Sequence, residues 1–272
     1  MNILYDHNLD SYQGFFDHEW SKHVLDFTKG TNLEYIVKNI CISWKGISNA
    51  RRLPYLMTDM ISAATEGAVN RLPVVTSEMI SKLIHRISNG LEINKITLKK
   101  SDRKALVDEL EQTNKELIER SKEKPYTANR NEVWPISIDQ DEFIFSLWMS
   151  EVNAYCAIYF AYEIFLIDSI KSIKKLAKLR TTSTRFQQEL ESLVGPELTE
   201  SLWSGNVVEK ARLIRHALVH NGRKITADLQ RYRDKLVLTD DDEVVIMPEN
   251  TTQLYKDLQV RVSHYCNKLI DK

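Results

Sequence analysis

The spacing of apolar positions along the chain predicts a mainly helical protein. Apolar residues recur three and four positions apart, which is the period of an α-helix, through most of its 272 residues. Residues 142–180 form the longest such stretch, and they are apolar on nearly all sides as far as Ile170. A helix of this kind must be buried against several others or at a subunit interface. We therefore interpret it as a buried core helix.

Shorter stretches with the same period surround this helix. Residues 33–90 are expected to be helical in two or three pieces, because Pro54 and Pro73 can each begin a new helix. The charged residues 101–124 carry a narrow apolar stripe, which is typical of a solvated helix and could also serve as an arm that contacts a second copy of the chain.

The C-terminal part adds a small amount of β-structure. Two short β-rich runs flank the acidic turn at residues 239–242 and predict a hairpin, and Pro248 then opens a last helix. The expected fold is therefore mainly α, a helical bundle with a small C-terminal β-hairpin.

One segment interrupts the helical period and suggests a domain boundary. Residues 125–141 contain Pro125 and Pro135 together with polar residues, and they show no helical spacing. We therefore expect an N-terminal helical region over residues 1–124, a linker over 125–141 and a second helical domain over 142–272.

The composition supports long helices and limits the mode of ligand binding. The chain has only 8 glycines and 6 prolines, which argues against a sandwich of many short strands. Its formal net charge is −1, so binding to nucleic acid through bulk positive charge is excluded and any such binding must use a local patch.

The cysteines and the N-terminus indicate in which compartment the protein works and whether it binds a metal. The cysteines are odd in number and far apart, without metal-ligand spacing, and the N-terminus is polar. We therefore expect a cytoplasmic protein without a metal or other cofactor. The most apolar run, residues 152–167, is too short for a membrane span and is interrupted by Asn153 and Glu163.

Residues 207–224 concentrate the groups that could carry chemistry. Their apolar positions give a helix one buried face, and Asn221-Gly222 is a strong stop signal. The last turns before this stop hold cationic and proton-transferring side chains, namely Arg212, Arg215, His216 and His220.

The segment from Arg215 to His220 consists of an arginine, a polar residue, three more residues and a histidine, followed by Asn-Gly. This pattern, with a long aromatic-rich helix upstream, resembles the signature of the HEPN superfamily of all-α domains. The resemblance covers the second half of the chain. It implies a metal-independent endoribonuclease, a toxin or phage-defence effector, whose active site is completed by two copies across a homodimer interface. It also implies an antitoxin or defence partner protein.

The residue types fit RNA cleavage without a metal. Imidazole suits proton transfer near neutral pH, and guanidinium suits the charge of a phosphorane. We therefore expect His220 to be the acid/base group and Arg215 the phosphate stabiliser. His216 would position the substrate or the arginine, and Arg212 would be an auxiliary contact.

Two further elements could complete the site. Lys175, Lys178 and Arg180 follow the long apolar helix and could form a phosphate-contacting ridge, or they could only complement the helix dipole. Glu163 lies inside the apolar helix, where an unpaired carboxylate would be costly, so we expect it to pair with Arg212 or Arg215 as a structural partner.

Other interpretations of the same residues remain open. Arg and His before a glycine are also what helix capping and dipole complementarity favour. The chain could then be a non-catalytic HEPN-like interaction or dimerisation module. A metal site at His216 and His220 would need a third ligand that the neighbouring sequence does not offer.

Overall fold

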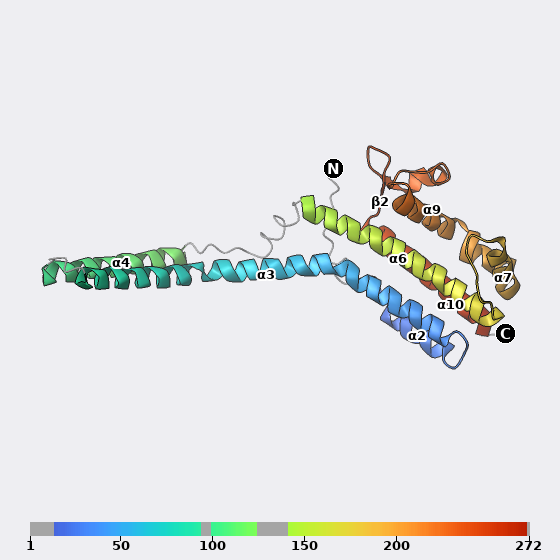
Figure 1. The fold of residues 1–272 in the computed structure, drawn as a ribbon, viewed down its shortest axis with the longest axis horizontal. Helices are drawn as coiled ribbons and strands as arrows, with labels where there is room; N and C mark the ends of the chain where they lie inside the picture. Colours follow the sequence, from blue (N-terminus) through green and yellow to red (C-terminus); the bar gives the residue numbers. More distant parts are fainter. Residues whose placement is uncertain (1–13, 94–98, 124–140, 271–272) are drawn as a thin grey trace. The chain divides into compact units, whose positions relative to one another are not determined.

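The computed structural model describes residues 14–93, 99–123 and 141–270, and the fold in these ranges is mainly helical (Figure 1). The chain forms two compact units, Met1–Leu56 together with Glu142–Lys272, and Met57–Asp141. The predicted fold class is confirmed, including the small hairpin near the C-terminus. No helix among the described residues is long and apolar enough to cross a membrane.

The elements follow one another along the chain as helices with a single hairpin. The N-terminal helices are α2 (His18–Thr28), α3 (Glu34–Ile93) and α4 (Lys100–Glu123). The second half begins with α6 (Asp141–Lys174), α7 (Thr184–Val194), α8 (Pro196–Thr199) and the π-helical turn η1 (Glu200–Ser204). It continues with α9 (Asn206–His220), the 3-10 helix η2 (Leu229–Lys235), β1 (Val237–Leu238), β2 (Val244–Val245) and α10 (Pro248–Ile270).

Helix α3 corrects one expectation from the sequence. It runs without interruption from Glu34 to Ile93 and includes both Pro54 and Pro73, so the prediction of two or three separate helices was wrong. A proline inside a helix removes one backbone donor and costs about 3 kcal/mol. That cost is local, and α3 continues through both prolines over its 60 residues.

The two units divide the chain differently from the predicted domains. The sequence placed residues 1–124 in one region, whereas α2 and the beginning of α3 belong to the same unit as residues 142–272. Their side chains join its core, as buried Val24, Val37 and Trp44 show. The predicted linker lies outside the described residues except for Asp141, the first residue of α6.

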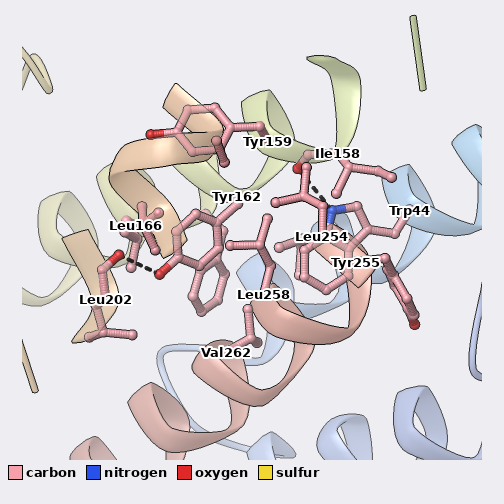
Figure 2. Close-up of a cluster of buried hydrophobic side chains, with 14 of the residues drawn as sticks. Trp44, Ile158, Tyr159, Tyr162, Leu166, Leu202, Leu254, Tyr255, Leu258 and Val262 are labelled. Atoms are coloured by element: carbon pink, nitrogen blue, oxygen red, sulfur yellow. Dashed lines mark hydrogen bonds between the residues drawn. The ribbon is translucent and has the colours of Figure 1, made fainter. Parts of the chain in front are cut away.

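The core of the larger unit is built around α6. Figure 2 shows α6 side chains packed among residues of α3 and α10, with two hydrogen bonds that cross between elements. The indole Nε1 of Trp44 donates to the carbonyl of Ile158 at 3.1 Å, and the hydroxyl of Tyr162 donates to the carbonyl of Leu202 at 2.7 Å. These bonds satisfy polar atoms that burial would otherwise leave unpaired.

A buried ion pair joins three distant parts of this unit. Arg51 Nε lies 2.6 Å from Glu151 Oε1, and both side chains are almost fully inaccessible to solvent. The other Glu151 oxygen accepts from the Thr251 hydroxyl at 2.8 Å. The remaining Arg51 nitrogens donate to the hydroxyl of Thr252 and to the carbonyl of Pro248, each at 3.2 Å. The charges are therefore both paired and hydrogen-bonded, as burial requires.

The hairpin forms at the predicted place. Strands β1 and β2 are antiparallel, with Val237 opposite Val245 and Leu238 opposite Val244. Both residues of β2 are buried in the core. The hairpin therefore packs on the helices rather than standing free in solvent.

Two tyrosines of α6 allow a matched test of this packing. Tyr162→Phe should destabilise the protein by about 1–2 kcal/mol, because the buried Leu202 carbonyl loses its donor. Tyr159→Phe should be neutral or slightly stabilising, because the buried Tyr159 hydroxyl has no partner among the described residues. Urea unfolding of the two variants measures the difference, and equal losses of stability would contradict it.

Candidate functional site

Helix α9 carries the candidate site on the side that faces away from the core. Its buried residues are Val208, Ala211, Ile214 and Ala217, which recur three and four positions apart. The helix ends as predicted, because Gly222 adopts a left-handed conformation with φ of +54°. Figure 1 shows α9 beside α6, and side chains of these two helices build the site.

Arg215 is held in place by α6. Its NH1 lies 3.1 Å from Glu163 Oε2, and its guanidinium carbon lies 5.7 Å from the centre of the Phe160 ring. The side chain of Glu163 is 11% exposed and that of Arg215 is 28% exposed. The expected pairing of Glu163 with an arginine of this helix is therefore formed, and it leaves part of the guanidinium open to solvent.

Burial sets the ionisation of Glu163. It raises the pKa of this carboxyl above its usual value, whereas the positive charges of Arg215 and Arg212 lower the pKa. Removal of Arg215 would take away the larger of the two influences that lower this pKa and would therefore favour the protonated form of Glu163.

The two histidines are exposed and lie one helical turn apart. The ring centres of His216 and His220 are separated by 5.1 Å, and the ring planes are tilted by 44°. Neither imidazole makes a hydrogen bond or ion pair with any residue that the structure describes. Both rings are therefore available to a ligand that approaches α9 from solvent.

Arg212 is engaged elsewhere. Its NH2 lies 3.8 Å from Glu209 Oε1, and its guanidinium lies 5.4 Å from the centre of the Trp203 ring. Glu209 also binds Arg231 at 2.6 Å and accepts from the hydroxyl of Tyr232 at 3.0 Å. This network ties α9 to η2 and gives Arg212 a structural partner, and its auxiliary contact with a substrate stays a prediction.

The basic residues after α6 do not continue that helix. Helix α6 ends at Lys174, and Lys175 adopts a left-handed conformation with φ of +54°. Lys175, Lys178 and Arg180 therefore lie on the exposed connection to α7 and do not form a ridge on one helix. Among the described residues, no hydrogen bond or ion pair links their side chains to α9.

Phe160, which the sequence did not single out, contacts Arg215 and is 51% exposed. Its position three residues before Glu163 places both side chains on the same side of α6, and this spacing is a signal that could have identified it. Phe160 also lines an apolar groove of about 530 Å³ between α3 and α6. Ile36, Ile40 and Ile47 of α3 and Ala157 and Ile164 of α6 form other parts of its lining.

A protein metal site needs several ligating side chains close together. No group of three or more His, Cys, Asp or Glu side chains that could hold a metal ion occurs in the described ranges of the chain. Within these ranges the neighbouring imidazoles of His216 and His220 have no third protein ligand of the kind that a catalytic zinc site uses.

The ion pair predicts a pH-dependent loss of stability. Arg215→Ala should destabilise the protein by about 1–3 kcal/mol near neutral pH, because it leaves the carboxylate of Glu163 largely buried and unpaired. The pKa of Glu163, already raised by burial, should then rise further. A carboxyl whose pKa is higher in the folded than in the unfolded state loses stability as the pH increases, so the loss should shrink in acid.

Urea unfolding at about pH 7.5 and about pH 5 measures this change, since the lower value lies close to the usual pKa of a glutamate. The double variant Arg215→Ala with Glu163→Gln is the control, because it has no carboxyl to titrate at this position. A loss of stability that is the same at both pH values in the single variant would show that Arg215 does not stabilise Glu163.

Comparisons with known proteins do not add to this geometry. Neither a protein-family model, nor a curated protein, nor a solved structure matches the chain. The HEPN resemblance therefore depends on the residues of α9 and α6 themselves, above all on Arg215, His220 and the Asn-Gly that follows.

Proposed function

We propose that the protein is a metal-independent endoribonuclease of the HEPN type. The observation that carries this proposal is that α9 holds two exposed imidazoles, 5.1 Å apart, together with a guanidinium that is fixed by a carboxylate of α6. Proton transfer and phosphate binding are the two capacities that RNA cleavage without a metal requires.

The reaction follows from these groups. A base removes the proton of a ribose 2′-hydroxyl, and the resulting alkoxide attacks the adjacent phosphorus. The bond from phosphorus to the 5′-oxygen breaks, and an acid protonates the leaving oxygen. The products are a 2′,3′-cyclic phosphate and a 5′-hydroxyl. His220 would exchange protons, and His216 would help to position the phosphate.

Arg215 would stabilise the negative charge that develops on the phosphorane. Its contact with Glu163 Oε2 is made by NH1, and a guanidinium has five N–H donors in total. Donors not used in that contact can face a phosphate oxygen from a fixed position. Such preorganisation avoids the cost of orienting the charge during the reaction.

A second copy of the chain would complete the site. The groove between α3 and α6 is lined by large apolar side chains that remain exposed, among them Ile42 at 59%, Phe160 at 51% and Ile164 at 38%. Contiguous exposed apolar surface marks interaction sites. Because Phe160 also contacts Arg215, a homodimer formed through this groove would bring the two α9 helices near one another.

The cellular setting would be the cytoplasm. Cys41 and Cys266 are buried free thiols, and Cys156 is a half-buried one, as is usual in a reducing compartment. There the protein would act as a toxin or phage-defence effector, and an antitoxin or defence partner protein would restrain or trigger it.

A second candidate function is a non-catalytic helical interaction module. The engagement of Arg215 by Glu163 and of Arg212 by Glu209 favours it, because both arginines then have structural partners. In this case the apolar groove would still bind a second copy, but the histidines would have no chemical role.

Cleavage of labelled RNA in the presence of EDTA distinguishes the two candidates. The wild-type protein should cleave and leave 2′,3′-cyclic phosphate ends, and His220→Ala should lower the rate at least about 100-fold because the proton-transfer group is lost. Arg215→Gln should lower the rate as well, with the folded fraction checked by circular dichroism.

His264→Ala is the matched control, because His264 is an exposed histidine on α10. It should cleave at the wild-type rate. Absence of cleavage by a folded, dimeric wild-type protein would favour the interaction module. Equal rates for wild type and His220→Ala would exclude His220 as the acid/base group.

The dimer can be tested without reference to catalysis. Ile42→Asp places a charge in the apolar groove and should weaken dimerisation at least about 10-fold, since burying an unpaired carboxylate is unfavourable. Light scattering after size-exclusion chromatography measures the mass. Val260→Asp on α10, 51% exposed, is the control and should remain dimeric. A dimer that survives Ile42→Asp would show that the groove is not the interface.

A further inference from the structure

Phe145, near the beginning of α6, is an exposed aromatic side chain outside the residues discussed so far. It is 57% exposed, and its ring centre lies 5.7 Å from that of Trp148. Trp148 is only 6% exposed and belongs to the core. The indole therefore gives Phe145 a rigid support on one side, while the rest of its ring remains in solvent.

Arg223 lies against the same indole. Its guanidinium carbon is 4.2 Å from the centre of the Trp148 ring, the shortest of the described contacts between a cation and an aromatic ring. The backbone of Arg223 adopts a φ of +70°, which is uncommon for a residue with a side chain. Its N–H donates to the carbonyl of Ala217, and its carbonyl accepts from the N–H of Val244, both at 2.9 Å. Two elements thus fix Arg223 in this conformation.

Arg223 and the residue after it, Lys224, both contact the carboxylate of Glu243. Arg223 NH2 lies 3.5 Å from Glu243 Oε2, and Lys224 Nζ lies 3.4 Å from Glu243 Oε1. Two cations thus share one carboxylate, while Asp242, whose pKa is lowered by Arg233 and also by Lys224, is itself paired with Arg233. The side chain of Lys224 is 54% exposed, which leaves it accessible to an anion from solvent.

This cluster of Phe145, Trp148, Arg223 and Lys224 adjoins the candidate site. Arg223 follows His220 by three residues, and its hydrogen bond to Ala217 belongs to the turn that closes α9. A strand whose phosphate lies at His220 would therefore continue along the turn that carries Arg223, which shares the Trp148 indole with Phe145.

We propose that Phe145 stacks on an unpaired nucleobase of single-stranded RNA, while Arg223 and Lys224 contact the phosphate of that nucleotide. The inference rests on the proposed ribonuclease function and specifies its substrate class. Single-stranded RNA is recognised by bases that stack on aromatic side chains and by cations that track the backbone. Double-stranded RNA keeps its bases stacked within the helix, so this position discriminates against it.

Binding of a fluorescein-labelled single-stranded RNA tests the proposal. All proteins carry His220→Ala, so that binding is measured without cleavage, and fluorescence anisotropy gives the dissociation constant. Phe145→Ala should weaken binding about 5- to 100-fold, the range found when a base loses an aromatic partner. Phe145→Trp should retain affinity, and the annealed duplex should bind more weakly than the single strand.

Tyr35→Ala is the matched control, because Tyr35 is an aromatic residue on α3 that is 72% exposed. It should bind as tightly as the parent protein. Equal affinities for Phe145→Ala and the parent would overturn the stacking position and leave the proposed function standing if the wild type cleaves RNA. A wild-type protein that neither binds nor cleaves RNA would overturn both.

Light scattering on the same variants separates RNA binding from protein contact. Phe145→Ala should have the same mass as the parent protein. Conversion of the parent dimer to a monomer by Phe145→Ala, but not by Tyr35→Ala, would identify Phe145 as a subunit contact and overturn the proposal.

Discussion

Helix α6 is apolar around most of its circumference, so no stable fold of this chain can leave it surrounded by water. Helices from both ends of the sequence share its core. They are α2 and the beginning of α3 from the N-terminal part and α10 from the C-terminal part. This requirement explains why residues before position 57 group with the C-terminal part of the chain. It also fixes the surface on which α9 packs.

The same requirement shapes the candidate site. A carboxylate in an apolar helix needs a cation, and Arg215 supplies it to Glu163 at the edge of the core. The arginine is thereby fixed on the same helix as the exposed rings of His216 and His220, rather than on a loop. The ion pair with Glu163 both stabilises the fold and positions Arg215. Variants of Arg215 therefore have to be tested for folding as well as for activity.

Local signals in the sequence were sufficient where one element decides the outcome. The Asn-Gly after His220 ends α9, and the buried charge of Glu163 led to its pairing with an arginine of that helix. Prediction from the sequence failed where contacts between distant parts of the chain determine the structure. Pro54 reads as a helix start, yet α3 continues through it. Phe145 and Arg223 meet at Trp148 only because the turn after α9 packs on α6, and no local spacing reveals that contact.

The hydrogen bonds of Arg51 have a consequence for folding of the chain during its synthesis on the ribosome. Its partners lie about 100 residues away in α6 and about 200 residues away at the beginning of α10. Contacts of such sequence separation form late in folding, because long loops must close first. A ribosome-bound chain that has not yet released α10 already holds Glu151, the ion-pair partner of Arg51, but lacks the hydroxyl of Thr252 and the carbonyl of Pro248. The larger unit, and with it the surface that α9 presents, therefore lacks part of its core contacts until α10 has emerged.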